Sequence, residues 1–362
     1  PLGFKIQKEE IQMRNLKRAL SLALAAIMLI GMMVVSASAT GLDDFSDKDK
    51  VVNKDAVSML TTLGVINGKE DGSYFDPTGN VTRAEMAKMI ATVLNQGADV
   101  DGLYVGMNTG LTDVKGHWAE SYINYCYSLG IIAGRGNGKF DPAATVTGNE
   151  AAKMLLVAVG YDPAIEGFEG ADWAINVSVR ADEQGIFEGF TKDLSAPLNR
   201  DDAALLIYNA LDVEMIQSYT TNNYPIVYSD HRTILSDKYG VIKVEGVVTA
   251  NEWAILDDDT DTALQEGKTR IYNPDGILST TGNTAVAQDS SANVKTQVFN
   301  VSTPVDMLGK AVTMYVKKTT ILADSTVYGA PVVSDVNTVI ETGEKVTGGD
   351  SKDDDSLAAL LK

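Results

Sequence analysis

The sequence predicts a multidomain protein: an all-α module of three repeated units packed around a shared helical core, followed by a β-rich domain folded as a sandwich or small barrel. Three observations support this prediction. One segment recurs three times between residues 40 and 218. Its helices carry apolar residues three and four positions apart. After residue 219 the pattern changes to alternation of apolar and polar residues, rich in β-branched side chains.

Composition and charge narrow the classes of function. The chain has 362 residues, 44% hydrophobic and 22% charged, which is enough for two or three domains. Its formal net charge of −19 repels polyanions, so we expect no nucleic-acid partner. An anionic partner would need a local basic site. The one cysteine, Cys126, allows no disulfide within the chain, and its apolar neighbours at helical spacing predict a buried, inert thiol.

Residues 1–39 are predicted to be an N-terminal extension and a secretory signal peptide. A basic start at residues 14–18 precedes 17 apolar residues and the small-residue ending Ala37-Ser38-Ala39. A retained membrane anchor is the alternative, but this run is at the short end for a membrane span. Cleavage after Ala39 would give a secreted chain without a membrane segment.

The repeated unit defines three helical segments. The spacing of 17 positions from Asp47 to Gly64 recurs from Asp113 to Gly130, and a further copy follows. We assign residues 40–98, 108–165 and 166–218 to the three copies. In each copy the first helix is expected to end at a glycine, the residue that best accepts the left-handed C′ conformation (Gly64, Gly130, Gly185). A second glycine follows four residues later (Gly68, Gly134, Gly189), and F-D-P closes the loop in the first two copies.

The second helix of each copy begins with a capping residue and an acid three positions later. The pairs are Thr82 with Glu85, Thr147 with Glu150, and Asn199 with Asp202. Arginine follows the cap in two copies, as Arg83 and Arg200, whereas Gly148 stands there in the second copy. The cap and the arginine therefore vary independently, which leaves the arginine without an evident role in starting the helix.

These motifs resemble a known family. The stretches "LTDVKGHWAESYINYCYSLGIIAGRGNGKFDP" and "GVINGKEDGSYFDPTGNVTRAE" look like S-layer homology domains, the anchoring repeats of bacterial surface proteins, with the third copy divergent. The resemblance implies a pseudo-threefold arrangement of three helical hairpins. It also implies binding of anionic secondary cell-wall polysaccharide, a polymer linked to peptidoglycan, in grooves between neighbouring copies.

The resemblance further implies which residues contribute to the grooves. They are the arginines Arg83 and Arg200, the acids Asp47 and Asp113, and the tryptophans Trp118 and Trp173. An arginine fork pairs with carboxylate or phosphate, and an acid accepts from sugar hydroxyls. The alternatives are core packing for the tryptophans and a solvated first-turn position for Arg83. Each copy lacks part of the motif, so one or two grooves, rather than three, are left for binding.

Residues 219–345 are predicted to be the β-rich domain, and residues 346–362 a flexible acidic tail. The acidic run at 257–261 lacks the spacing of a known calcium loop, which favours a solvated turn. With only His117 and His231 in the chain, we expect no metal site, no cofactor and no catalytic triad. The sequence thus predicts a secreted, non-enzymatic surface-layer protein able to self-assemble. A wall-targeted polysaccharide-acting enzyme and a surface adhesin are the alternatives.

Overall fold

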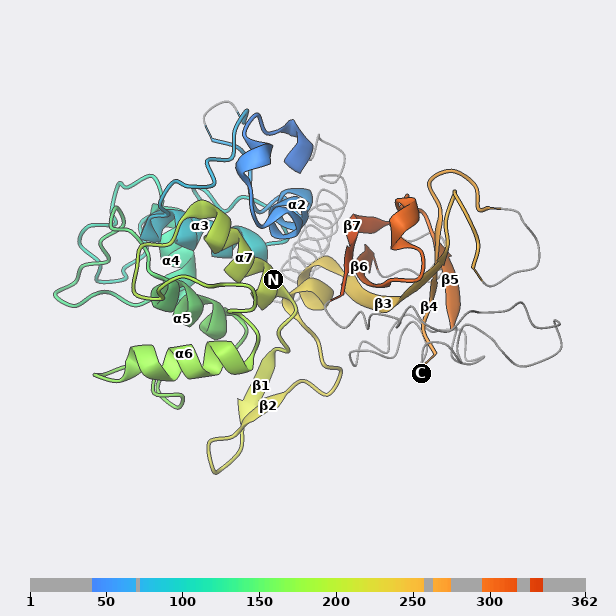
Figure 1. The fold of residues 1–362 in the computed structure, drawn as a ribbon. Helices are drawn as coiled ribbons and strands as arrows, with labels where there is room; N and C mark the ends of the chain where they lie inside the picture. The colour runs from blue at the N-terminus through green and yellow to red at the C-terminus, as the bar shows by residue number, and fades with distance from the viewer. Residues whose placement is uncertain (1–40, 70–71, 257–262, 275–294, 318–325, 335–362) are drawn as a thin grey trace, which may run out of the picture. The chain divides into compact units, whose positions relative to one another are not determined.

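The computed structural model describes residues 41–69, 72–256, 263–274, 295–317 and 326–334. Six α-helices lie in the N-terminal part of this range (Figure 1). They are α2 (Lys54–Thr62), α3 (Arg83–Leu94), α4 (Glu120–Ser128), α5 (Gly148–Ala158), α6 (Trp173–Glu183) and α7 (Arg200–Leu211). The predicted signal peptide, the 257–261 run and the acidic tail lie outside the described residues. No helix in the described ranges is long and apolar enough to cross a membrane.

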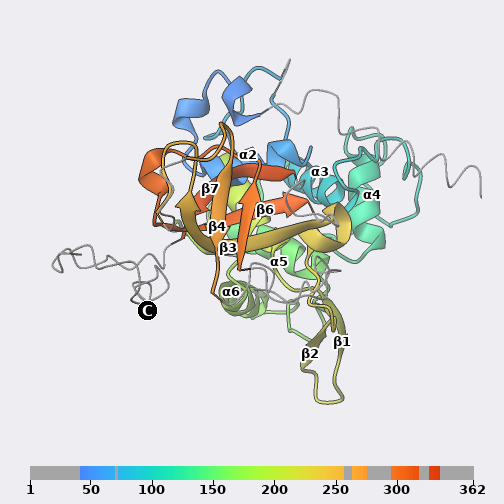
Figure 2. The ribbon, with the colours of Figure 1, turned by 90° about the vertical axis from the view of Figure 1, so that its right-hand side faces the viewer.

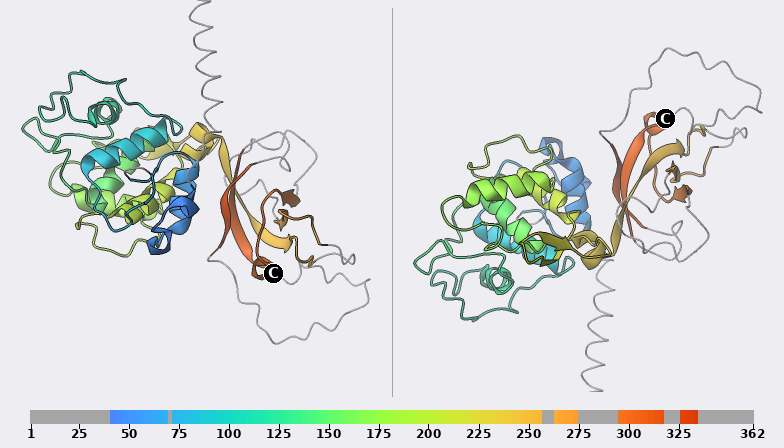
Figure 3. Two further views of the ribbon diagram at one scale, coloured as in Figure 1. Left: turned by 90° about the horizontal axis from the view of Figure 1, so that it is seen from above. Right: turned by 90° about the horizontal axis from the view of Figure 1, so that it is seen from below.

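The helices pair between the sequence copies. The first helix of each copy packs on a second helix from another copy: α2 on α7, α4 on α3, and α6 on α5. The second helices α3, α5 and α7 also meet through α5, around a shared core. Figure 3 shows the helical part from above and from below. The shared helical core is therefore present, but the expected hairpins form between copies and not within them, because each apolar stripe is buried against a neighbour.

A ring of backbone hydrogen bonds joins the segments that precede the three second helices. Val81 N donates to Leu198 O (2.9 Å), Val146 N to Val81 O (2.9 Å), and Leu198 N to Val146 O (2.8 Å). These three residues stand directly before the caps of α3, α5 and α7. The three helices thus start from equivalent places around one centre.

The local predictions for the helix ends are confirmed. Thr82 and Thr147 each form a capping box with the glutamate three residues later, and the Asn199 side chain accepts from Asp202 N (2.8 Å). Each such cap stabilises a helix by about 1 kcal/mol. The three glycines that end the first helices have φ of 72°, 73° and 70° (Gly64, Gly130 and Gly185).

The core of the helical part contains the predicted aromatic and apolar side chains. Phe75 and Phe140 of the two F-D-P loops are fully buried. Cys126 is buried too, its Sγ lies 3.5 Å from Ala87 O, and burial raises the pKa of its thiol to about 12. The expectation of a buried thiol is therefore confirmed, and the raised pKa disfavours the reactive thiolate.

Strands follow the helices, as predicted. A short hairpin of β1 (Ile216–Tyr219) and β2 (Pro225–Val227) lies in the stretch that links the two parts. An antiparallel five-stranded sheet has the order β5-β4-β3-β6-β7 (Figure 2). Its strands are β3 (Val241–Ala250), β4 (Thr269–Tyr272), β5 (Thr296–Phe299), β6 (Ala311–Lys317) and β7 (Val327–Val333). One face of this sheet has a core of its own, built around Val244, Val248, Phe299 and Val312. Whether the sheet belongs to a sandwich or a barrel stays a prediction.

Candidate functional site

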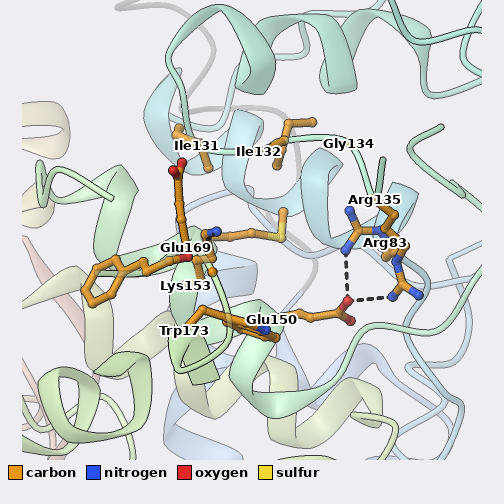
Figure 4. Close-up of a pocket in the computed structure, with 13 residues that line it drawn as sticks. Arg83, Ile131, Ile132, Gly134, Arg135, Glu150, Lys153, Glu169 and Trp173 are labelled. Atoms are coloured by element: carbon orange, nitrogen blue, oxygen red, sulfur yellow. Dashed lines mark hydrogen bonds and ion pairs between the residues drawn. The ribbon is translucent and has the colours of Figure 1, made fainter. Parts of the chain in front are cut away.

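A cavity of about 670 Å³ lies among the ends of four helices (Figure 4). It is bounded by the start of α3, the loop after α4, one face of α5 and the segment that leads into α6. Its polar side chains are Arg83, Arg135, Glu150, Lys153, Glu169 and Trp173. Residues from all three predicted copies therefore meet here, at the kind of inter-copy position where the sequence predicted a binding site.

Glu150 joins two cations across the cavity wall. Its Oε1 lies 3.2 Å from Arg83 Nη1 and 2.5 Å from Arg135 Nη2, as the dashed lines in Figure 4 mark. Its Oε2 accepts from Thr147 N (3.0 Å), which is the capping interaction at the start of α5. One carboxylate therefore both caps a helix and fixes the position of two guanidinium groups.

Arg83 is buried, with 6% of its surface exposed. Its Nε donates to Phe140 O (2.9 Å), and its guanidinium carbon lies 4.5 Å from the centre of the Phe140 ring. Burial lowers the pKa of this guanidinium and Glu150 opposes that shift, but an arginine so placed keeps its charge. The alternative of a solvated first-turn side chain is wrong for Arg83, because its neighbour copy covers it.

Lys153 and Trp173 form the opposite side of the cavity. Lys153 Nζ donates to Phe168 O (2.6 Å) and lies 5.7 Å from the centre of the Trp173 ring. Burial lowers the pKa of the Lys153 ammonium. Trp173 is half-buried, so it packs on the core and also borders the cavity. A cation beside an indole face suits an acidic sugar, which offers a charge to the amine and a C–H face to the ring.

The three cations of the cavity outnumber its two carboxylates. In a chain whose net charge is −19, this is a local reversal of sign of the kind that an anionic ligand needs. Among the described residues, no group of three or more histidine, cysteine or acidic side chains is arranged to hold a metal ion.

Asp47 and Asp113 hold loops in place. Asp47 accepts from Phe75 N (2.8 Å) and Asp76 N (2.9 Å), and Asp113 accepts from Phe140 N and Asp141 N, both at 2.9 Å. Burial raises the pKa of Asp113, but these backbone donors outweigh it and the net pKa is lowered. Neither acid borders the cavity, so their predicted contact with a ligand stays a proposal beside this structural role.

Arg200 and Trp118 lie away from the cavity. The Arg200 guanidinium carbon is 5.1 Å from the centre of the Phe75 ring, and its Nη2 donates to Asn67 O (2.7 Å). Trp118 is 53% exposed, with its ring 6.3 Å from that of Tyr122. Of the six predicted residues, the structure therefore brings together Arg83 and Trp173 only.

Sequence reasoning missed Arg135, Lys153 and Glu169, and it assigned Glu150 to the helix cap alone. A signal was present for two of them. Lys153 stands three residues after the capping glutamate, as Lys88 does in the first copy, and Arg135 follows the second loop glycine, as Lys69 does. No local pattern of the sequence marks Glu169.

Comparisons with known proteins agree with these motifs. The model of the S-layer homology domain matches residues 44–87 and 110–152. A cell surface protein of Thermoanaerobacter kivui is 28% identical over 271 residues, which cover 74% of this chain and 32% of that protein. An S-layer protein of Bacillus licheniformis is 28% identical over 135 residues, or 37% of this chain and 15% of that protein. An amylopullulanase of Thermoanaerobacterium thermosulfurigenes is 30% identical over 174 residues, which cover 44% of this chain and 9% of that protein.

The chain spans about a third or less of the length of these curated relatives. The domain matches and the surface proteins among the relatives indicate a secreted protein at the cell surface. Its helical part carries two S-layer homology domains, at residues 44–87 and 110–152.

Proposed function

We propose that the helical part attaches a surface-layer protein non-covalently to the cell wall by binding an anionic secondary cell-wall polysaccharide. The cavity lined by Arg83, Arg135 and Lys153 is the binding site. The observation that carries the proposal is that the three cations of the cavity outnumber its two carboxylates, beside an indole ring, in an otherwise acidic chain. Arg83 and Arg135 share Glu150, whereas Lys153 has no carboxylate within ion-pair distance among the described residues, and Glu169 of the same cavity acts on it only through its charge.

The proposal assigns a separate task to each cavity residue. Lys153 pairs with an acidic group of the polymer, Trp173 stacks on the sugar ring, and Glu150 accepts from a sugar hydroxyl with its remaining lone pairs. Arg83 contributes charge from the wall of the cavity. We assign no catalytic step to these groups.

Residues 166–218 are proposed as a third, divergent copy of the domain. The ring of hydrogen bonds through Val81, Val146 and Leu198 supports this, as do the Asn199 cap and the left-handed Gly185. A pseudo-threefold arrangement follows from such a copy. For the sheet we propose a place in the assembled layer, with adhesion to another surface as the alternative.

Co-sedimentation with purified sacculi of Thermoanaerobacter kivui tests wall binding. We expect the chain to sediment with the sacculi, and Lys153→Gln with Trp173→Ala to reduce retention at least tenfold. Lys310→Gln removes the charge of another half-buried lysine, in the sheet part and not in the cavity, and serves as the matched control, with retention unchanged. Failure of the wild-type chain to sediment, or equal retention of all variants, would contradict the proposed site.

The similarity to an amylopullulanase favours one second candidate, a wall-targeted enzyme that acts on polysaccharide. The helical part would then hold an enzyme at the wall. Release of reducing sugar from amylopectin or pullulan by the chain would support this candidate. No release at micromolar protein concentration would exclude this enzymatic activity for these 362 residues.

A further inference from the structure

A second cavity, of about 360 Å³, lies beside the start of α4. Residues 106–112, from the segment between α3 and α4, form one wall, and Val114, Lys115, Glu120 and Asn124 complete the lining. We call it the loop cavity. It shares no lining residue with the cavity of the proposed wall site, and its volume is in the range of small-molecule sites.

Side chains of α4 hold this loop in place. Glu120 Oε1 accepts from Gly106 N (2.8 Å) and Oε2 accepts from Gly116 N (2.7 Å), so one carboxylate fixes both ends of the intervening segment. Asn124 Nδ2 donates to Tyr104 O (2.8 Å), just before this segment. A site whose walls are already fixed loses little freedom on binding, which favours a ligand.

The α4 wall of the loop cavity presents hydrogen-bond acceptors. The backbone donors Gly106 N and Gly116 N lower the pKa of Glu120, burial opposes this, and Lys115 lowers it further, so the carboxylate is charged at neutral pH. Its two oxygens keep lone pairs beyond these bonds. One turn along α4, Asn124 is 2% exposed, and its Oδ1 has no hydrogen-bond partner among the described residues. A buried acceptor without a donor is unfavourable, so this wall lacks a donor group.

The remaining lining supplies a cation and an apolar surface. Lys115 is exposed, and no carboxylate lies within ion-pair distance of it in the part of the chain that the structure describes. Met107, Leu111 and Val114 are the apolar residues of the lining. One cavity therefore combines a carboxylate, an amide oxygen, an ammonium group and apolar side chains.

We propose that the loop cavity binds a small zwitterion of the α-amino acid class. The ligand's ammonium group has three N–H donors, enough for the Glu120 carboxylate and Asn124 Oδ1, which are neighbours because residues four apart share a helix face. The ligand's carboxylate pairs with Lys115, and its side chain contacts the apolar lining. A free amino acid and the first residue of a peptide share the ammonium group, but the free amino acid alone carries both charges on one residue.

The pair of Glu120 and Asn124 is particular to the second copy. The residues that align with this pair are Lys54 and Ser58 in the first copy, and Ile175 and Val179 in the third. The connection before it is also longer, because residues 95–119 lead from α3 to α4, whereas residues 159–172 lead from α5 to α6. The loop cavity is therefore an addition to one copy, and the inference goes beyond the proposed function.

Titration of alanine with the full chain, followed by ligand-observed NMR of the alanine methyl signal, tests the site. We expect a dissociation constant of about 1 mM. N-acetylalanine lacks the ammonium group, and alaninamide lacks the carboxylate, as the first residue of a peptide does. Each of these two probes should bind about tenfold more weakly than alanine, because each loses one charged contact.

Two variants assign the two ends of the ligand. Lys115→Gln, at an exposed position, should reduce the affinity for alanine to that for alaninamide and leave alaninamide binding unchanged. Glu120→Gln should weaken the binding of both probes about tenfold, and thermal unfolding checks that this variant folds. Lys50→Gln removes another exposed lysine of the helical part, so it is the matched control and should bind alanine as wild type does.

The outcomes separate this inference from the proposed function. No binding of alanine by wild type at about 20 mM, far above the expected dissociation constant, would overturn the inference, as would equal binding of all three probes. Unchanged alanine binding by Lys115→Gln would overturn the role of Lys115. On sacculi, Lys115→Gln should be retained as wild type is, and Lys153→Gln with Trp173→Ala should keep alanine binding.

Discussion

Arg83 and Arg200 occupy the same place in the first turn of their helices, yet their surroundings differ. Around Arg83 the neighbouring copy supplies a carbonyl and a carboxylate, Phe140 O and Glu150, and the guanidinium is buried and paired. Around Arg200 the described residues of the neighbouring copy supply the Phe75 ring and one hydrogen-bond acceptor, Asn67 O, and they leave Nε without a hydrogen-bond partner. The same residue in the same motif therefore joins a buried ion pair in one place and keeps an unpaired donor, within the described residues, in the other.

The largest expected effect follows from this difference. Arg83→Gln removes one partner of a buried ion pair and leaves Glu150 with less compensation, so we expect a loss of about 3 kcal/mol in the free energy of unfolding. Arg200→Gln removes a guanidinium that makes one hydrogen bond among the described residues, to Asn67 O, and should lower stability less, by about 0.5–1 kcal/mol. Urea unfolding of the two variants measures both values. Equal losses would contradict the distinction between the two arginines.

A smaller effect is expected from the two capping glutamates. Glu150→Gln weakens both the α5 cap and the pairs with Arg83 and Arg135, and should lower the free energy of unfolding by about 2 kcal/mol. Glu85→Gln affects a carboxylate that, within the described residues, bonds Thr82 alone, and should lower the free energy of unfolding by about 1 kcal/mol. Chemical unfolding of the pair isolates the contribution of the ion pairs. A larger loss in the free energy of unfolding for Glu85→Gln than for Glu150→Gln would contradict the stabilising role of the Glu150 ion pairs.

The smallest effect concerns the loop under Arg83, which Asp113 holds. The folded pKa of Asp113 lies below its ordinary value, so its carboxylate stabilises the fold above about pH 4, and this contribution is lost as the pH falls through the folded pKa. Asp113→Asn should be less stable than wild type by about 1 kcal/mol at pH 7 and should approach it in acid. Unfolding free energies between pH 3 and 7 test this. A gap that stays constant with pH would rule out titration of Asp113 as its cause.

Much of the helical part was predictable because its signals are local. A cap depends on residues three positions apart, so Thr82 with Glu85 identified the start of α3 from sequence alone. A helix end that needs positive φ selects glycine, as at Gly130. The alternation in residues 241–250 identified β3 for the same reason, since successive side chains of a strand face opposite ways.

The candidate site was less predictable. Residues such as Arg83 and Trp173 were found through a family resemblance, but Lys153 and Arg135 carry no local signature that separates a cavity-lining cation from a solvated one. Arg83 was expected to be either solvated or in contact with a ligand. The structure excludes the solvated alternative and pairs Arg83 with Glu150 of another copy, whereas contact with a ligand stays a prediction. Such pairs join residues far apart in the chain, so rules based on short sequence spacings cannot predict them.

The sequence by itself determined the repeated unit, the caps and turns of its helices, the change from helices to strands and the buried Cys126. Each depends on a few neighbouring residues. Only the tertiary structure decided that first helices pair with another copy, that Leu194 packs against Gly148, where the other two copies have arginine, and that Arg200 Nε has no hydrogen-bond partner among the described residues. The physical reason is that packing and burial determine which groups an apolar stripe or a charged side chain contacts. Both depend on which surfaces the folded chain brings together.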